Sequence, residues 1–285
     1  MKPPRHKADR VSSNTRGKES AFADGFVRHI PVPNDVGTAV SSRRKRRGIN
    51  LDVVEMKLSI IMPVFNEKKT IEEILRQLTA VKIPKVDKEI IVIDDQSTDG
   101  TRKFLERVKK KLSGLKILYH TQNLGKGAAV RTGIQQASGE MFLIQDADLE
   151  YDPRDIPKLV KPIQEGKAEV VYGSRFTGER RNMLFWHMMG NRFLTFLTNL
   201  LYNTTLSDME VCYKLFTRKA LKNVKLKENR FGFDPEITVK ILKKGIRIYE
   251  VPISYAGREF EEGKKVRWYD GLRILWVLIK YRLVD

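Results

Sequence analysis

The chain has 285 residues, 41% of them hydrophobic and 31% charged, which predicts a largely globular, soluble protein with one large α/β domain or a domain plus an appendage. Its formal net charge of +19 favours a polyanionic partner, and nucleic acid, acidic lipid and phosphorylated small molecules all fit. A single cysteine excludes an internal disulfide, and with neither an apolar N-terminal segment nor a run of about 18 apolar residues we expect no secretory signal and no membrane-spanning helix.

The first segment, residues 1–50, is predicted to be a disordered basic tail. Within it, residues 1–48 hold 12 Lys or Arg against 4 Asp or Glu and end in "SSRRKRRG". The segment has no hydrophobic periodicity, so it buries too little apolar surface to offset its ordering entropy. The basic run suits a nucleic-acid patch or a nuclear signal, but we favour a solvated or membrane-attracted tail.

From Leu58 the chain alternates between apolar runs and segments with helical spacing. Strands are predicted at 58–65, 89–95, 116–120 and 141–144, and helices at 68–81, 100–112 and 127–137. Because the strands are apolar throughout and alternate with helices, we predict an α/β fold whose mostly parallel sheet has helices on both faces.

The second half is less regular. We expect a strand running into a loop at 169–176, an apolar helix pair at 183–203, a strand and helix at 212–221, a helix at 234–245, an edge strand at 246–255 broken by Pro252, and a final amphipathic helix at 268–283. Cys212 is expected to be a small core residue rather than a catalytic thiol.

Three predicted strands run directly into acidic or amide residues. The segments are "PVFNE", "DDQSTDGT" and "QDADLE". In an open parallel sheet, ligands bind outside the carboxyl ends of the strands, so these clusters should face one crevice. We therefore predict a single site that includes Glu67, Asp94, Asp95, Asp146 and Asp148.

Asp146, Asp148 and Glu150 stand at alternate positions, with no Cys or His nearby. Such carboxylates suit a hard divalent cation, Mg²⁺ or Mn²⁺, which usually completes its shell with phosphate oxygens and water. The alternative is that Asp146 and Asp148 only cap a turn before Pro153. We favour the metal site, because the acids end one buried strand beside another strand that also ends in acids.

Other nucleotide and metal motifs do not fit. "NLGKGAAVRTG" has Ala128 after Gly127 where a Walker loop needs Lys, and Val130 where a dinucleotide fingerprint needs its third glycine. The four histidines are scattered, so a zinc hydrolase is not expected.

Six segments in order resemble the GT-A glycosyltransferases of family 2. They are "SIIMPVFNE", "IIVIDDQSTDGT", "NLGKGAAVRTG", "DADLEYDP", "YGSRF" and "SDMEVCYKLF". The sequence is most similar to the dolichyl- or polyprenyl-phosphate mannosyl- and glucosyltransferase branch, and the resemblance covers about residues 58–282. It implies a GT-A (Rossmann-like) fold with C-terminal amphipathic helices, in which 51–285 form the catalytic domain, 51–180 the nucleotide-sugar half, and 181–285 the acceptor and membrane-facing half.

The resemblance also implies roles for particular residues. Nucleotide-binding residues are expected to be Pro63, Val64, Asn66, Glu67, Asp94, Asp95, Lys126 and Asp146. Metal ligands are expected to be Asp146, Asp148 and Glu150, and catalytic residues Asp148, Asp208 and Arg175. The acceptor phosphate is expected to contact Arg175, Lys214, Arg258 and Lys264, with Lys265 as a further candidate.

The implied reaction is metal-dependent, inverting transfer of a hexose from GDP-mannose or UDP-glucose to a polyprenyl or dolichyl phosphate. A divalent ion stabilises the leaving diphosphate as a Lewis acid. A phosphate monoester is mostly dianionic near pH 7, so the acceptor needs no strong general base.

A lipid acceptor requires contact with a membrane that this chain is not expected to span. We hypothesise that 183–203 and 268–283 lie on the cytoplasmic membrane face, with basic residues on anionic headgroups. The residues expected to enter the bilayer are Trp186, Phe193, Phe196, Trp268 and Trp276. The alternative is that both helices belong to the core.

Three other functions stay open. The runner-up is a family 2 enzyme that acts on a polysaccharide or protein acceptor. A nucleotidyltransferase would share the architecture, but its Gly-rich basic loop is missing after the first strand, where "PVFNEKKT" stands. A non-enzymatic nucleic-acid-binding protein would use the +19 charge, although we find no nucleic-acid module.

Overall fold

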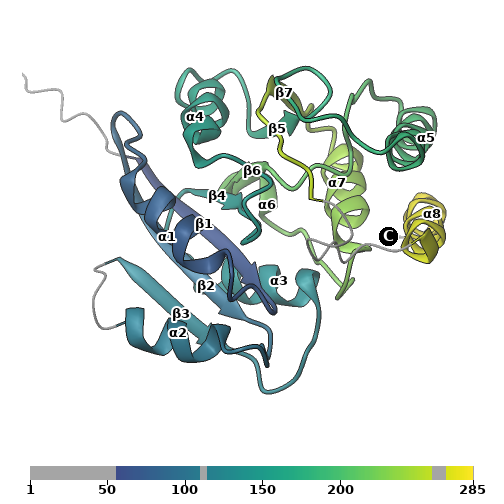
Figure 1. Cartoon of the computed structure of the whole chain (residues 1–285). Helices are drawn as coiled ribbons and strands as arrows, with labels where there is room; N and C mark the ends of the chain where they lie inside the picture. Colours follow the sequence, from purple (N-terminus) through teal and green to yellow (C-terminus); the bar gives the residue numbers. More distant parts are fainter. Residues whose placement is uncertain (1–55, 110–113, 259–267, 285) are drawn as a thin grey trace, which may run out of the picture. The chain divides into compact units, whose positions relative to one another are not determined.

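The structure is a computed structural model that describes residues 56–109, 114–258 and 268–284 (Figure 1). The predicted tail at 1–50, the candidate phosphate ligand Lys264, its neighbour Lys265 and the side chain of Trp268 lie outside the described residues.

The described residues form a seven-stranded sheet in the order β3-β2-β1-β4-β6-β5-β7. The strands are β1 Met56–Val64, β2 Val86–Asp94, β3 Leu115–Tyr119, β4 Met141–Ile144, β5 Val170–Ser174, β6 Lys214–Thr217 and β7 Tyr249–Pro252. All pairs are parallel except those of β6, which runs antiparallel to β4 and β5. The prediction of a mostly parallel sheet is confirmed.

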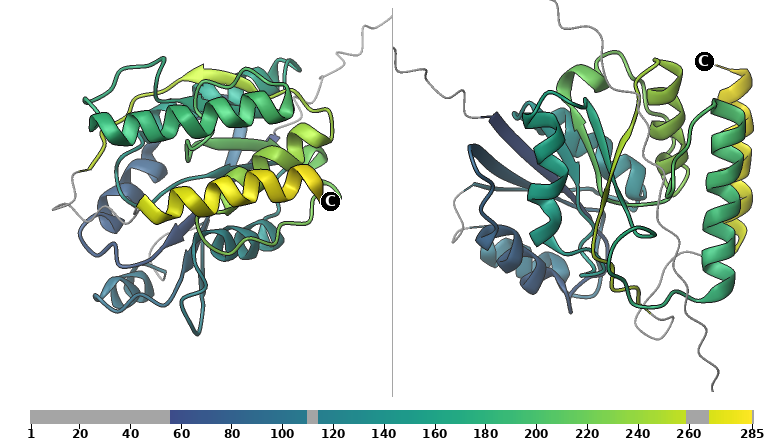
Figure 2. Two further views of the ribbon diagram at one scale, coloured as in Figure 1. Left: turned by 90° about the vertical axis from the view of Figure 1, so that its right-hand side faces the viewer. Right: turned by 90° about the horizontal axis from the view of Figure 1, so that it is seen from above.

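Helices cover both faces of this sheet, as predicted (Figures 1 and 2). They are α1 Ile71–Ala80, α2 Thr101–Val108, α3 Lys126–Gln136, α4 Ile156–Gln164, α5 Phe185–Tyr202, α6 Arg218–Leu221, α7 Phe233–Lys243 and α8 Trp268–Leu283, with a 3₁₀ turn η1 at Pro153–Asp155. Helices α1, α2 and α4 lie on one face, and α3 and α7 on the other. Helices α5 and α8 lie side by side outside α7 (Figure 2).

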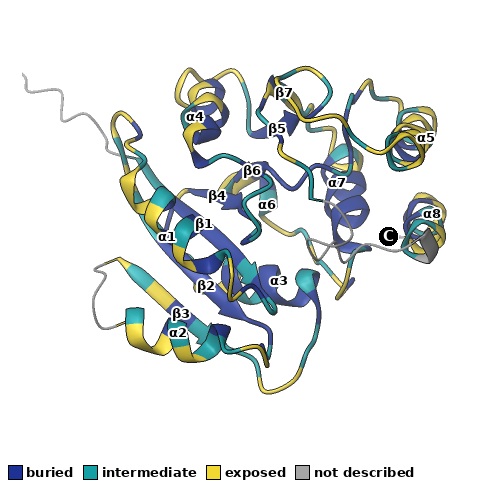
Figure 3. Ribbon diagram, in the orientation of Figure 1, coloured by how far each residue is buried: buried dark blue, intermediate teal, exposed yellow. Residues whose placement is uncertain are grey.

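The core forms where the apolar periodicity of the sequence predicts it (Figure 3). Strands β1, β2 and β4 bury consecutive residues, because helices cover both of their faces. Helix α1 buries Ile71, Ile74, Leu75 and Leu78, the apolar stripe of its 3.6-residue repeat.

Two elements differ from the prediction. Helix α4 was not expected, because Pro157 and Pro162 obscure its pattern. Pro157 lies in the first turn, where a helix needs no amide donor. Pro162 lies inside α4 and belongs to the buried apolar face of the helix, whose packing against the core offsets the missing hydrogen bond. The expected helix pair at 183–203 is one continuous helix, α5, in which Gly190 causes no break.

The register of the strands sets the site at one edge of the sheet. Val64 at the end of β1 pairs with Asp94 at the end of β2, and Ile144 at the end of β4 pairs with Ile61. The loops after these parallel strands therefore leave the sheet at the same edge. Because β6 is antiparallel, the segment that precedes it, residues 207–213, also lies at this edge.

Candidate active site

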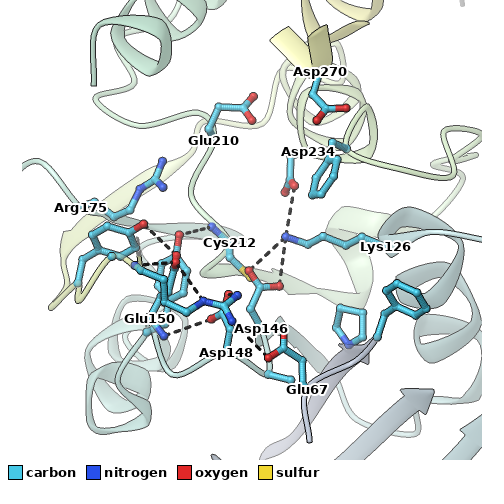
Figure 4. A pocket seen from close by; sticks show the side chains of 18 of the residues that line it. Glu67, Lys126, Asp146, Asp148, Glu150, Arg175, Glu210, Cys212, Asp234 and Asp270 are labelled. Carbon is cyan, nitrogen blue, oxygen red and sulfur yellow. Dashed lines mark hydrogen bonds and ion pairs between the residues drawn. The ribbon is translucent and has the colours of Figure 1, made fainter. Parts of the chain in front are cut away.

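A cavity of about 940 Å³ opens at this edge, among the described residues (Figure 4). Its wall is formed by the end of β1 and the loop after it, the loop before α3, the acids after β4, the segment before β6 and the starts of α5, α7 and α8. The predicted residues that line it are Pro63, Val64, Glu67, Asp95, Lys126, Asp146, Asp148, Glu150, Arg175 and Arg258. Ten of the predicted positions are thus brought together by the fold.

Asp95 shapes the loop that leads into α3. Its carboxylate accepts hydrogen bonds from the Leu124 amide over 2.9 Å and the Gly125 amide over 2.7 Å, and it lies 2.7 Å from His120 Nδ1. Gly125 has φ +96°, a region that favours glycine, and a Cβ there would lie 2.6 Å from the carbonyl oxygen of Asn229. Asp95 thereby holds Lys126 at the cavity wall.

Asp94 and Asn66 lie behind the wall rather than on it. Asp94 is fully buried, accepts a hydrogen bond from the Ser97 amide and lies 3.2 Å from Arg102 Nε. The Asn66 side-chain oxygen accepts a hydrogen bond from the Thr98 amide over 2.8 Å. Both side chains make hydrogen bonds within the loop after β2 and neither lines the cavity, so their contact with the nucleotide stays a prediction.

The loop after β4 holds its acids in a strained turn. Leu149, between Asp148 and Glu150, has φ +64°, and for a residue other than glycine this conformation costs roughly 1 to 3 kcal/mol. The Glu150 amide donates to Asp148 Oδ1 over 3.2 Å, and the Tyr255 hydroxyl donates to Glu150 Oε2 over 2.9 Å. The strained conformation of Leu149 forms a turn in which Asp148 and Glu150 both point into the cavity (Figure 4).

Two cations compensate these acids. Lys126 Nζ lies 3.2 Å from Asp146 and 3.5 Å from Asp234, which is not among the predicted residues. Burial by itself would lower the pKa of Lys126, but the carboxylates of Asp146 and Asp234 raise it well above its ordinary value. Lys126 therefore carries a full positive charge beside the predicted metal site.

Arg258 is the second cation, and three carboxylates converge on it. Its Nη2 donates to Asp148 over 2.7 Å, its Nη1 to Glu67 over 3.3 Å, and its Nε lies 3.5 Å from Glu150. Burial, together with Asp146 and Glu150, nevertheless raises the pKa of Asp148 to about 7. Among the described residues, the acids at this point exceed the positive charge that is paired with them.

The donor set fits a divalent cation bound together with a phosphate ligand. Among the described residues, no three His, Cys, Asp or Glu side chains are grouped as a complete protein cage. Mg²⁺ and Mn²⁺ do not need one, because they are usually bound by one or two carboxylates and by substrate phosphates. Asp146 and Asp148 would be the oxygen donors of such a site, whereas Glu150 accepts hydrogen bonds from the Tyr255 hydroxyl and the Arg258 amide.

Arg175 and Asp208 form a closed pair deeper in the wall. Arg175 Nε and Nη2 each donate to one Asp208 oxygen over 2.7 Å, and the Arg175 amide also donates to Asp208 over 3.1 Å. Asp208 is fully buried and does not line the cavity. In this arrangement Asp208 positions Arg175, which reaches the cavity above the ring of Tyr255, and the catalytic role of Asp208 stays a prediction.

Lys214, a predicted contact of the acceptor phosphate, does not line the cavity. It lies in β6, is fully buried, and its Nζ donates to Asp234 Oδ1 over 2.7 Å. Strand β6 lies between β4 and β5, so the side chain of Lys214 lies in the interior of the fold, and its contact with the acceptor phosphate stays a prediction.

Three further acids at the cavity were missed by the sequence analysis. Glu210 comes from the segment before β6, Asp234 from the first turn of α7 and Asp270 from the start of α8 (Figure 4). Burial and Asp234 raise the pKa of Glu210 to about 7. The signal for Glu210 was its place two residues after Asp208, within a motif already singled out. No local sequence motif predicts that Asp234 and Asp270 belong to the site.

Cys212 is buried, as predicted, although it also touches the cavity. Burial raises the pKa of its thiol well above the ordinary value, which disfavours the nucleophilic thiolate.

The chain belongs to Glycosyl transferase family 2, which matches residues 59–225, more than half of its length. The family resemblance seen in the six segments is therefore confirmed, and the chain is a family 2 glycosyltransferase. Membership argues against the nucleotidyltransferase and the non-enzymatic nucleic-acid-binding protein considered above.

Among curated proteins, an uncharacterized protein of Methanocaldococcus jannaschii is 30% identical, with 80% of this chain and 93% of that protein covered. Dodecaprenyl-phosphate galacturonate synthase of Rhizobium johnstonii is 28% identical, covering 75% of this chain and 63% of that protein. Dolichol-phosphate mannosyltransferase of Pyrococcus furiosus is also 28% identical, covering 79% and 64%. The chain spans less than two thirds of the length of the latter two.

Among solved structures, glucosyl-3-phosphoglycerate synthase of Mycobacterium tuberculosis in complex with UDP has a TM-score of 0.62 at 19% identity, with 81% of each chain covered. The same enzyme in complex with Mg²⁺ and UDP has a TM-score of 0.62 at 19% identity, covering 82% of this chain and 83% of that one. It has also been solved with Mn²⁺, UDP and glucosyl-3-phosphoglycerate. At this identity the likeness shows the fold, which confirms the predicted GT-A-like architecture.

Proposed function

We propose that this protein transfers a hexose from a nucleotide sugar to a polyprenyl or dolichyl phosphate, in a metal-dependent reaction that inverts the anomeric carbon. The observation that carries the proposal is the meeting of Asp146 and Asp148 with Lys126 and Arg258 at the carboxyl edge of the sheet. The names of two relatives, one a mannosyltransferase and one a galacturonate synthase on polyprenyl phosphates, support a lipid-phosphate acceptor.

The donor's diphosphate is proposed to lie against Asp146, Asp148 and Lys126. The two acids would hold Mg²⁺ or Mn²⁺, which when bound neutralises charge on the leaving diphosphate. Lys126 contributes a permanent positive charge at the same place, because its two carboxylate partners keep it protonated. Pro63 and Val64 line the same wall and are proposed to contact the nucleoside.

The acceptor phosphate is proposed to meet Arg175 and Arg258. Arg175 is held by Asp208, which accepts hydrogen bonds from its Nε and Nη2, and Arg258 lies among Glu67, Asp148 and Glu150. A dianionic phosphate needs no proton removed before it attacks, so the proposed transfer does not require Asp208 to act as a general base.

Helices α5 and α8 support contact with a lipid surface. Each presents a stripe of large apolar residues to solvent, at helical spacing, on the side opposite its buried residues. The exposed residues are Phe185, Trp186, Met189, Phe193, Phe196 and Leu200 on α5 and Leu272, Trp276, Ile279 and Leu283 on α8. Among the described residues no helix is long and apolar enough to span a bilayer. We propose that the pair lies in the plane of a membrane interface.

The experiment is transfer by the purified full-length chain, offered GDP-mannose or UDP-glucose with Mn²⁺ and a short polyprenyl phosphate. We expect a glycolipid from one of the two donors and none after chelation of the metal. Transfer to a carbohydrate hydroxyl, with none to lipid phosphate, would replace the acceptor in this proposal by that of the runner-up. No turnover of either donor with any acceptor would contradict the proposed reaction.

A further inference from the structure

Glu210 is the acid of the cavity for which the described residues supply no partner. It lines the wall, and its Oε1 is shielded from solvent without a hydrogen bond. In Figure 4 its carboxylate projects into the cavity between Arg175 and Asp234. A carboxylate oxygen that is shielded from water and has no hydrogen bond is costly, so Oε1 calls for a ligand that donates a hydrogen bond to it.

The neighbouring acids show that this is not a general feature of the wall. Asp208 is paired with Arg175, and Asp234 lies 2.7 Å from Lys214 and 3.5 Å from Lys126. Arg175, Lys214 and Lys126 are thus paired with other acids. Asp234 in addition places a like charge near Glu210. The side chain of Glu210 is thus left with acceptor capacity and excess negative charge.

We propose that Glu210 determines sugar specificity: it accepts hydrogen bonds from hydroxyl groups of the donor's hexose and, by its charge, excludes hexuronic acids. An ionised carboxylate is only an acceptor, and a hexose ring offers several hydroxyl donors. A uronic acid would instead place a second carboxylate in a cavity already rich in acids, which discriminates by repulsion. This inference rests on the proposed function and narrows its donor to neutral hexoses.

The position of Glu210 favours the donor sugar over the acceptor phosphate. Lys126 links Asp234 to the metal ligand Asp146, and Glu210 lies beside Asp234 (Figure 4). The hexose is attached to the diphosphate proposed to lie at Asp146, so it falls within this part of the cavity. A dianionic phosphate at Glu210 would be repelled by its carboxylate and by that of Asp234.

The test measures kcat/KM for two donor pairs, UDP-glucose with UDP-glucuronate and GDP-mannose with GDP-mannuronate, using Glu210→Gln. This change keeps the shape of the side chain and removes its charge. The matched control is Glu72→Gln, which removes the same charge from an exposed position on α1. Binding of UDP and GDP with Mn²⁺ is measured in parallel, because it reports on the nucleotide site without the sugar.

For the pair that the wild type uses, we expect a preference for the neutral hexose that falls at least tenfold in Glu210→Gln and stays unchanged in Glu72→Gln. Nucleoside diphosphate affinity should be the same in all three proteins. An unchanged ratio with intact nucleotide binding overturns the specificity role alone, as does a wild type that prefers the uronate. If the wild type binds neither nucleotide, the proposed function fails and this inference fails with it.

Discussion

At the scale of single residues, the site is a set of acids, most but not all of which are neutralised by cations among the residues that the structure describes. Asp234 and Asp208 have full partners in Lys214 and Arg175, whereas Asp148 shares Arg258 with two other carboxylates. The residual negative charge around Asp148 is what a divalent cation would remove. The first prediction follows from that imbalance.

Replacing Asp148 with Asn should remove the metal dependence of nucleotide binding and lower transfer by roughly 10²- to 10³-fold, the usual effect of deleting one electrostatic contact to the transition state. The affinity for GDP and UDP would be titrated with and without Mn²⁺. Asp152→Asn is the control, because Asp152 lies four residues away and is paired with Arg154 outside this cavity. Retained Mn²⁺ dependence in Asp148→Asn would remove this residue from the metal site.

Glu210 should also lower the stability of the free protein in a pH-dependent way. Its pKa is raised to about 7 from 4.5 by burial and by Asp234, so the folded state binds the proton more tightly than the unfolded state does. Stability due to this group is therefore present below about pH 4.5 and is lost as the pH rises to 7. Glu210→Gln should stabilise the protein by on the order of 1 to 3 kcal/mol at pH 8 and have little effect at pH 4.

Denaturant unfolding of Glu210→Gln and wild type at both pH values measures this difference. A stabilisation of equal size at pH 4 and pH 8 would mean that packing, and not the charge of Glu210, is responsible.

At the scale of elements, the loop 228–231 connects the start of α3, at the cavity wall, to α8. The Asn229 carbonyl accepts a hydrogen bond from the Ala128 amide at the start of α3. Glu228 lies 2.9 Å from Arg273 and 3.0 Å from Lys280, both on α8. The start of α3 and the loop are in such close contact that a side chain at Gly127 would not fit: a Cβ there would lie 2.4 Å from the Glu228 carbonyl oxygen.

Gly127→Ala should therefore displace the loop, destabilise the fold by about 1 to 3 kcal/mol and weaken nucleotide binding. The matched control is Gly190→Ala in α5, where no atom lies within 4 Å of the added Cβ. That control should stabilise the protein by about 0.5 to 1 kcal/mol, because alanine favours the helix. Thermal unfolding and nucleotide titration of both variants test the pair, and equal effects would show that the close contact at Gly127 is unimportant.

At the scale of the whole molecule, the positive charge of the chain and its exposed apolar stripes point to the same kind of partner. Trp186 is 81% exposed on α5 and Trp276 is 62% exposed on α8, and the two helices lie side by side (Figure 2). Amphipathic helices bind membrane interfaces through buried apolar area, and basic residues add attraction to anionic lipids.

The full-length chain should float with anionic liposomes more strongly than with neutral ones, and less as salt rises, because ionic strength screens the attraction. Trp186→Ser combined with Trp276→Ser should reduce bound protein by roughly 3- to 10-fold without changing nucleotide affinity, since neither residue lines the cavity. Unchanged flotation of the double variant would show that α5 and α8 do not contact the lipid.

Much of this protein could be predicted from its sequence. Apolar strands that alternate with amphipathic helices predict a parallel sheet. Strands that are apolar on both faces are buried only when helices cover both faces of the sheet. The acids Asp146 and Asp148 and the family segments predict where the site lies, since parallel strands present their carboxyl ends at one edge. These features depend on short segments of the chain, and the pattern of a short segment can be recognised from its sequence alone.

The partners of each charge were decided only by the tertiary structure. The sequence predicts the same role for Lys214 and Arg258. In the structure Lys214 is buried in β6 against Asp234, whereas Arg258 lines the cavity. Glu210 enters the cavity because β6 runs antiparallel, which no local pattern states. Ion pairing and burial depend on which distant segments meet, and that is set by the packing of the whole sheet rather than by neighbours in the chain.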